Sequence, residues 1–222
     1  STAPVAQDDT GVVNGDATLV VADGTNLTSV DSATVDGSPL NVAAQVPAMR
    51  GITFNTDGTK MFLVGESSDA VSEYHLTTAF DVSTASLDSS FSVSSEETAP
   101  MSVKFNNDGT KMFVTGVSSD KVHEYTLSTA FDVSTASLED SLSVSGQDNN
   151  PFGLDFNNDG TKMYLTGDQN DKIYEYNLST GFDLSTASFN QELYLGSQDI
   201  EPFGIEFSPD GTRMFIVGTR DN

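Results

Sequence analysis

Cysteine is absent from this chain of 222 residues. Its absence excludes disulfide bonds, thiolate chemistry and any zinc site that uses cysteine ligands. Bacterial extracellular proteins often lack cysteine, so this feature favours an exported protein. We therefore expect a secreted or cell-surface protein of bacterial origin.

Basic residues are also few, since 9 Lys and Arg stand against 33 Asp and Glu, a formal net charge of −24 at pH 7. Such a surface repels polyanions, which argues against nucleic acid and anionic lipid as partners. No apolar run approaches the roughly eighteen residues that cross a bilayer, so we expect no membrane insertion.

Motifs of common catalytic sites are missing as well. The chain has no G-x-S-x-G, no H-E-x-x-H and no phosphate-binding loop. Its two histidines differ in their place within the repeat described below, because His75 follows Tyr74 whereas His123 precedes Glu124. They form no repeated metal or catalytic group, and we expect no enzymatic activity, no cofactor and no metal.

The sequence does contain a long internal repeat. Four copies of one motif align without a gap: FNTDGTKMF from Phe54, FNNDGTKMF from Phe105, FNNDGTKMY from Phe156 and FSPDGTRMF from Phe207. Successive copies are 51 residues apart (105 − 54, 156 − 105, 207 − 156). A second motif recurs at the same period, EYHLTTAFDVSTASL at 73–87, EYTLSTAFDVSTASL at 124–138 and EYNLSTGFDLSTASF at 175–189. A repeat of this length indicates one structural unit per copy.

Each repeat reads as short strands. GITF (51–54) and its copies precede an Asp-Gly turn, whose glycine tolerates positive φ. KMFLV (60–64) is nearly continuously apolar, as expected for a strand with both faces buried. VSEYHL follows, then FDVSTAS, then an alternating strand such as SFSVS (90–94). Four antiparallel strands in about 40–50 residues are typical of a propeller blade. The sequence thus predicts an all-β fold, a small β-propeller of four four-stranded blades.

The segment PFGIEFSPDGTRMFIVG (202–218) resembles the repeats of bacterial YVTN and lactonase-like propellers. Blades of that family start with a proline–glycine entry, followed by an F-S-P-D-G hairpin and an apolar strand. The resemblance covers residues 47–222 and implies a propeller fold. Propellers of this kind serve as enzymes, adhesins and scaffolds, so the resemblance implies no single activity.

We expect residues 1–15 to be an N-terminal arm and residues 16–222 a single propeller domain, with blades starting near 49, 100, 151 and 202. The fourth copy ends after two strands, which would leave an exposed edge. Residues 17–46 are expected to supply the missing strands and so to close the ring. They would do so within one chain or in a neighbouring chain, the latter giving a strand-exchanged homo-oligomer.

The segment PVAQDDTGVVNGDATLVVADG (4–24) resembles the start of the cadherin-like repeats of bacterial adhesins. Gly15 stands where those repeats have an acidic residue before Asp16. The resemblance implies an extracellular setting.

A calcium-loop pattern begins in the third copy, where Asp155, Asn157, Asp159 and Gly160 match D-x-N-x-D-G. The match fails at its twelfth position, because Thr166 stands where a bidentate glutamate is required. The other copies begin with Thr53, Lys104 and Glu206. We therefore expect a hairpin turn here.

Lysine and glutamate recur at two repeat positions, the lysine after the Asp-Gly turn and the glutamate in the next strand. The residues are Lys60, Lys111 and Lys162, with Glu73, Glu124 and Glu175. A ligand-binding ring of charges and an ion pair that braces each blade both fit this pattern. We favour the structural brace, because a carboxylate placed between apolar sheets needs a partner.

These features favour a non-catalytic extracellular binding or structural module, as part of an adhesin or surface assembly that binds a glycan or another protein. Near-identical blades support this, because an active site usually needs different residues from different blades. Two alternatives stay open. One is a propeller hydrolase or lactonase with a metal in the central channel, and the other is a strand-exchanged subunit of a self-assembling fibre.

Overall fold

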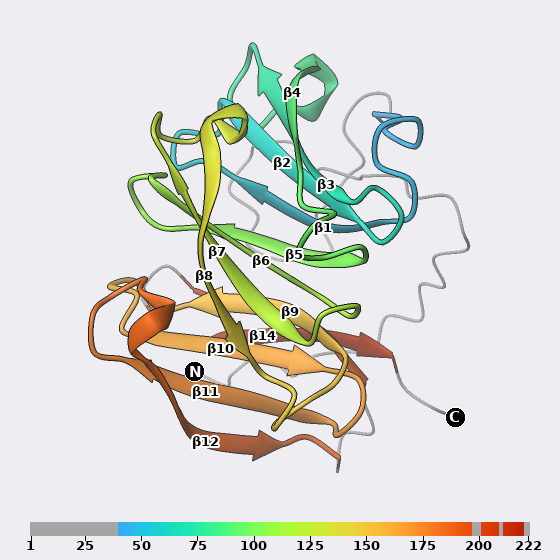
Figure 1. Ribbon diagram of the computed structural model, residues 1–222. Helices are drawn as coiled ribbons and strands as arrows, with labels where there is room; N and C mark the ends of the chain where they lie inside the picture. Colours follow the sequence, from blue (N-terminus) through green and yellow to red (C-terminus); the bar gives the residue numbers. More distant parts are fainter. Residues whose placement is uncertain (1–39, 197–200, 209–210, 220–222) are drawn as a thin grey trace, which may run out of the picture.

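The computed structural model describes residues 40–219 apart from 197–200 and 209–210 (Figure 1). In this part of the chain, the regular structure consists of fourteen strands and three short 3-10 helices. The strands form three four-stranded sheets and one two-stranded sheet, all antiparallel. The predicted all-β propeller architecture is confirmed.

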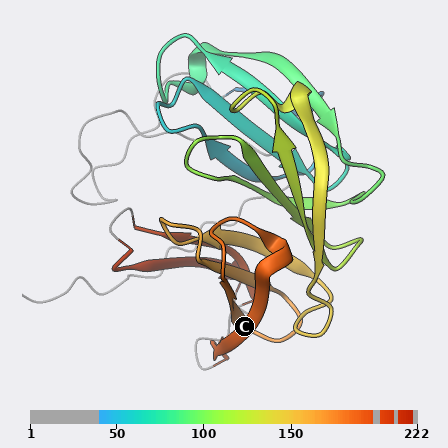
Figure 2. The ribbon, with the colours of Figure 1, turned by 60° about the vertical axis from the view of Figure 1, so that its left-hand side comes forward.

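Each complete sheet, or blade, is a meander whose strands lie in chain order (Figure 2). Blade 1 consists of β1 (Met49–Phe54), β2 (Lys60–Gly65), β3 (Ala70–Leu76) and β4 (Ala85–Ser92). Blade 2 consists of β5 (Pro100–Phe105), β6 (Lys111–Gly116), β7 (Lys121–Leu127) and β8 (Ala136–Ser143). Blade 3 consists of β9 (Pro151–Phe156), β10 (Lys162–Gly167), β11 (Lys172–Leu178) and β12 (Ala187–Tyr194).

The Asp-Gly sequences form the hairpin turns between the first and second strands. In blade 1, the Asp57 carboxylate accepts a hydrogen bond of 3.0 Å from the Thr59 amide, and Gly58 adopts a φ of +71°. That φ is one that side-chain-bearing residues rarely adopt. A Cβ at Gly58 would also lie 2.4 Å from the ring of Phe80, so glycine is required here on both counts.

Two FDVST sequences and one FDLST sequence form the 3-10 helices η2 (Val82–Thr84), η3 (Val133–Thr135) and η4 (Leu184–Thr186), each between the third and fourth strands. The aspartate before each helix accepts a hydrogen bond of 3.0 Å from the serine amide inside it: Asp81 from Ser83, Asp132 from Ser134 and Asp183 from Ser185. This is the ordinary capping role of aspartate, and it explains why the motif recurs.

The hydrophobic core lies between neighbouring blades. Met61, Phe62, Leu63 and Val64 of β2 are all 0 % exposed, so both faces of this strand are buried as predicted. Phe62 and Val64 pack with residues of blade 2, including Tyr125. Each large apolar side chain removed from water contributes about 1.5–3 kcal/mol. The near-continuous apolar run of the second strand is therefore what holds one blade to the next.

The fourth sheet differs from the other three. It consists of β13 (Glu201–Phe207) and β14 (Met214–Thr219), and β13 packs against β9 and β10 of blade 3. Most of the segment expected to add its missing strands, residues 17–39, lies outside the described residues. The described part of that segment, residues 40–46, packs on blade 1 through Val42 and Val46. Closure of the ring by the N-terminal segment therefore stays a prediction.

No helix among the described residues has the length and apolar character needed to cross a membrane.

Candidate functional site

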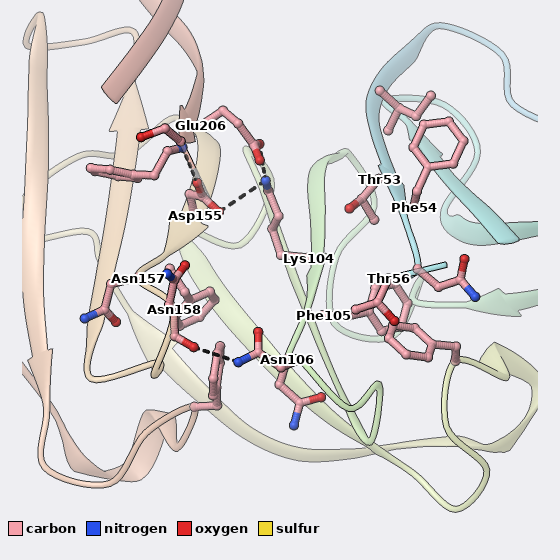
Figure 3. Close-up of a pocket in the computed structure, with 18 of the residues that line it drawn as sticks. Thr53, Phe54, Thr56, Lys104, Phe105, Asn106, Asp155, Asn157, Asn158 and Glu206 are labelled. Carbon is pink, nitrogen blue, oxygen red and sulfur yellow. Dashed lines mark hydrogen bonds and ion pairs between the residues drawn. The ribbon is translucent and has the colours of Figure 1, made fainter. Parts of the chain in front are cut away.

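A pocket of about 710 Å³ lies where the first strands of the four sheets end (Figure 3). Residues of β1, β5, β9 and β13, together with the turns that follow these strands, form its walls. A volume of this size suits a small organic ligand, for which pockets of about 300–1,000 Å³ are usual. The pocket is thus the first place to look for function.

One repeat position of the pocket wall carries a different residue in each sheet. It is the residue just before the last phenylalanine of the first strand, and its occupants are Thr53, Lys104, Asp155 and Glu206. Their neighbours in the repeat are nearly identical from copy to copy. Because the sheets are arranged around one pocket, this single position brings a hydroxyl, an ammonium and two carboxylates to one surface.

Lys104 links the two carboxylates. Its ammonium lies 3.2 Å from Asp155 Oδ1 and forms a second, shorter ion pair with Glu206 (Figure 3). The other oxygen of Asp155 accepts a hydrogen bond of 2.9 Å from the Phe207 amide. The side chains of Lys104 and Asp155 are only 15 % and 12 % exposed, whereas that of Glu206 is 66 % exposed. Asp155 and Lys104 are therefore held in place, and Glu206 reaches toward solvent.

The pKa of the Asp155 carboxyl is raised. Burial raises the pKa of its carboxyl above the ordinary value, Lys104 opposes part of that rise, and Glu206 adds to it. A carboxylate with a raised pKa is a better base than an exposed aspartate. Perturbed titratable groups of this kind gather at functional sites more often than elsewhere.

The rest of the pocket wall combines amides with aromatic rings. Asn106, Asn107 and Asn158 lie in the turns at its rim, and Asn107 donates a hydrogen bond of 2.6 Å to the main-chain oxygen of Asn158. Phenylalanine rings from the first strands and from the 3-10 connections also line it: Phe54, Phe80, Phe105, Phe131, Phe156, Phe182 and Phe207. Amides and rings together suit a ligand with hydroxyl groups on an apolar frame.

The lysines and glutamates expected to brace the blades form one ion pair in each of blades 1 to 3. Lys60 is 2.5 Å from Glu73, and Lys111–Glu124 and Lys162–Glu175 form shorter pairs of the same kind. None of the six residues lines the 710 Å³ pocket. The bracing role itself stays a prediction.

Two aspartates of the calcium-like segment, Asp155 and Asp159, make different interactions in the structure. Asp159 accepts hydrogen bonds of 3.0 Å from the Thr161 amide and 2.5 Å from its hydroxyl, as a capping residue of the hairpin does. Asp155 instead belongs to the pocket wall and pairs with Lys104. Within the described residues, no group of three or more His, Cys, Asp and Glu has the arrangement of a metal site. Since the Lys104 ammonium pairs with both pocket carboxylates, the donor set does not fit a channel metal.

The two histidines lie away from the pocket. His123 is buried in blade 2, with hydrogen bonds of 3.0 Å to Ser119 and 2.8 Å to Ser141, and burial lowers its pKa. His75 pairs across the strands with Lys60 in blade 1.

Sequence reasoning missed Lys104, Asp155 and Glu206 as a group. The signal was present, because a position that varies among near-identical copies is one that the repeat architecture does not dictate. We interpreted this variation only as a failed calcium pattern.

No family model and no curated protein matches the chain. Solved structures of similar fold include a candidate 6-phosphogluconolactonase of Bacteroides uniformis, with a TM-score of 0.56, 15 % identity and coverage of 76 % of this chain and 46 % of that one. The periplasmic gluconolactonase PpgL of Pseudomonas aeruginosa gives a TM-score of 0.55 at 15 % identity, covering 77 % of this chain and 47 % of that one. The β-propeller domain of Cps50 (Swd1) from Myceliophteria thermophila gives 0.53 at 13 % identity, covering 77 % and 50 %.

The last of these structures is a β-propeller domain, which confirms the fold, and this chain spans about half the length of each of the three. Several are named lactonases, and this overturns our expectation of a non-enzymatic binding or structural module. They point instead to the alternative weighed from the sequence, a hydrolase-like propeller. The physical reason for the error is the pocket position described above, where near-identical blades do supply different residues. At this level of identity, the chain is shown to share the fold of these proteins.

Proposed function

We propose that the chain hydrolyses a small hydroxylated lactone, with Asp155 as general base and Lys104 as the group that stabilises negative charge. The observation that carries this proposal is the Lys104–Asp155 pair, half-enclosed at a repeat position of the pocket wall that carries a different residue in every sheet. The lactonase names among proteins of similar fold support it.

The reaction needs only water and the lactone. Asp155 removes a proton from a water molecule as the water oxygen attacks the lactone carbonyl carbon. The electron pair of the carbonyl π bond moves to the oxygen, and the Lys104 ammonium stabilises that oxyanion. When the intermediate collapses, the bond between the carbonyl carbon and the ring oxygen breaks. The ring oxygen takes the proton from Asp155, and the product is the open hydroxy acid.

The pocket wall supports a substrate of this class. The amides of Asn107 and Asn158 at the rim are of the kind that bind hydroxyl groups, and the phenylalanine rings offer apolar surface to the carbon face of a sugar ring.

We also infer that the protein acts outside the cytoplasm. The absence of cysteine and the net charge of −24 support this, as does the likeness of residues 4–24 to the start of cadherin-like adhesin repeats. One propeller of similar fold is named a periplasmic enzyme.

An initial-rate assay with purified chain and a panel of γ- and δ-lactones tests the proposal, with D-glucono-1,5-lactone as the first substrate. Hydrolysis above the spontaneous rate is expected for at least one of them. Lys104→Met should lower kcat by about tenfold or more, because one charge-stabilising group is lost.

Lys172→Met is the matched control, since Lys172 pairs with Glu192 on blade 3 and does not line the pocket. If no lactone is hydrolysed, or if both lysine variants lose the same activity, the proposal is wrong.

A further inference from the structure

Lys104 is shared between two carboxylates, and the hydrolysis described above gives a role to only one of them. An ammonium group carries three N–H donors. That of Lys104 lies 3.2 Å from Asp155 Oδ1 and forms a shorter ion pair with Glu206 (Figure 3). Two donors are thus engaged, which leaves one for the carbonyl oxygen of a lactone. Glu206 therefore shares the group that stabilises the oxyanion.

The two carboxylates are held differently. Asp155 lies on β9, and its second oxygen accepts a hydrogen bond of 2.9 Å from the Phe207 amide. Glu206 reaches Lys104 from β13, 102 residues further along the chain. Among the pocket residues that the structure describes, these three side chains carry the formal charges, one ammonium and two carboxylates with a net charge of −1.

This net charge changes during the proposed reaction. It is −1 when the neutral lactone binds. It becomes zero when Asp155 takes a proton from water, because the carboxyl is then uncharged while the oxyanion forms on the substrate. It returns to −1 when the ring oxygen takes that proton. The side chains are therefore least negative at the step in which the substrate becomes negative.

The product carries a charge that the lactone lacks. A carboxylic acid has an ordinary pKa of about 4, so the open hydroxy acid is ionised at neutral pH. Its carboxylate is formed from the lactone carbonyl and thus beside Lys104. There it meets the carboxylates of Asp155 and Glu206, and like charges placed side by side repel. Without Glu206, the charges of Lys104 and Asp155 would cancel, and Lys104 would be free to hold the product as an ion pair.

We propose that Glu206 is a positioning residue that expels the hydroxy acid product. It occupies a donor of Lys104 that the product carboxylate would otherwise use, and it supplies the charge that makes the pocket repel an anion. This inference rests on the proposed lactone hydrolysis, and it assigns to the same site a low affinity for carboxylates of the product's shape.

The charge of Glu206 also acts on the reacting group. It adds to the rise in the pKa of the Asp155 carboxyl, so the two carboxylates interact although they lie on different sheets. Removal of the Glu206 charge should therefore lower the pKa of Asp155. A residue that only held β13 in place would have no such effect.

Isothermal titration calorimetry of the intact wild-type chain with two probes is the first test. D-Gluconate is the product of D-glucono-1,5-lactone, and D-glucitol has the same carbon chain with a hydroxymethyl group in place of the carboxylate. The wild type should bind D-glucitol about tenfold or more tightly than D-gluconate, because only the latter meets the negative pocket. This comparison leaves the protein unchanged, so folding of a variant does not enter.

Glu206→Gln keeps the shape of the side chain and removes its charge. It should bind D-gluconate about tenfold more tightly than the wild type does, and its affinity for D-glucitol should change by less than about twofold. Glu206→Asp keeps the charge and should stay within about threefold of the wild type for both probes. Glu139→Gln, on an exposed position of β8 outside the pocket, is the matched control and should leave both affinities within about twofold.

A carboxyl NMR titration of Asp155 gives a readout that does not depend on either probe. Its pKa should be lower in Glu206→Gln than in the wild type and unmoved in Glu139→Gln. An unmoved pKa in Glu206→Gln, no gain in D-gluconate affinity, or an equal gain for D-glucitol would overturn the proposal.

Failure of this inference can be told apart from failure of the proposed hydrolysis. If the wild type hydrolyses a lactone but Glu206→Gln gains no affinity for D-gluconate, the role of Glu206 is wrong and the hydrolysis stands. If no lactone is hydrolysed while Glu206→Gln binds D-gluconate more tightly, the hydrolysis is wrong and the exclusion of carboxylates by Glu206 stands.

Discussion

Two positions of the 51-residue repeat behave in opposite ways. The lysine at the start of the second strand is the same in blades 1 to 3, and each copy pairs with a glutamate in the third strand. The position before the last phenylalanine of the first strand is threonine, lysine, aspartate and glutamate in turn. The first position faces the neighbouring blade, and the second faces the shared pocket.

This difference distinguishes the residues that join neighbouring blades from the residues that line the pocket. A junction between blades must be rebuilt in the same way each time, so its residues repeat with the blade. A pocket formed by several sheets needs different groups on different sides, so its residues diverge. Substitutions at the first position should therefore change stability, and substitutions at the second should change activity.

The largest expected effect is on stability at the junction between blades 2 and 3. Glu124→Gln should lower the free energy of unfolding by about 2 kcal/mol or more, because a buried carboxylate loses its ion pair with Lys111 and a charged hydrogen bond from the Leu184 amide. Glu175→Gln, at a side chain that is 14 % exposed where that of Glu124 is 1 % exposed, should cost less than about 1 kcal/mol. Urea unfolding followed by circular dichroism measures both. Equal losses would show that the two glutamates are not distinguished by burial.

The second largest expected effect is a preference of the pocket for an uncharged substrate over a phosphorylated one. Among the pocket residues that the structure describes, the charged side chains are Lys104, Asp155 and Glu206, a net charge of 1 − 2 = −1. The two acids outweigh the one lysine, so a phosphate group would meet net repulsion. We expect kcat/KM for D-glucono-1,5-lactone to exceed that for its 6-phosphate by about tenfold or more. A preference for the phosphorylated substrate would refute this electrostatic account and leave lactone hydrolysis intact.

The smallest expected effect is a displaced pH profile. Asp155 acts as a base only when it is ionised, so activity falls as the pH drops through its pKa. Since burial raises that pKa, half of the activity should be lost at a pH above the ordinary aspartate value of 3.8. Lys104→Met removes a charge that lowers the pKa, and its residual activity should fall off at a still higher pH. The measurement is kcat against pH after subtraction of spontaneous hydrolysis, and an unmoved profile in Lys104→Met would contradict the assignment.

Much of the fold follows from local sequence. Asp-Gly predicts the hairpin at Gly58, and the apolar run of 60–64 predicts a strand buried on both sides; the structure confirms both. The sequence does not reveal that Lys60 reaches the carbonyl of Phe131, because that contact depends on how two blades pack together. The pocket was missed for the same reason. Lys104 and Asp155 are 51 residues apart (155 − 104), and only the arrangement of sheets around a common centre makes them neighbours.

A matched pair of variants on one hairpin tests most directly whether Asp155 is the base of a lactone-hydrolysing site. Asp155→Asn keeps the shape of the side chain and removes its basicity, so kcat for D-glucono-1,5-lactone should fall by about a hundredfold. Asp159→Asn alters a capping residue of the following turn and should leave kcat within about twofold, provided that circular dichroism shows the same fold. Equal activity of Asp155→Asn and wild type, or no lactone hydrolysis by the wild type, would contradict the account.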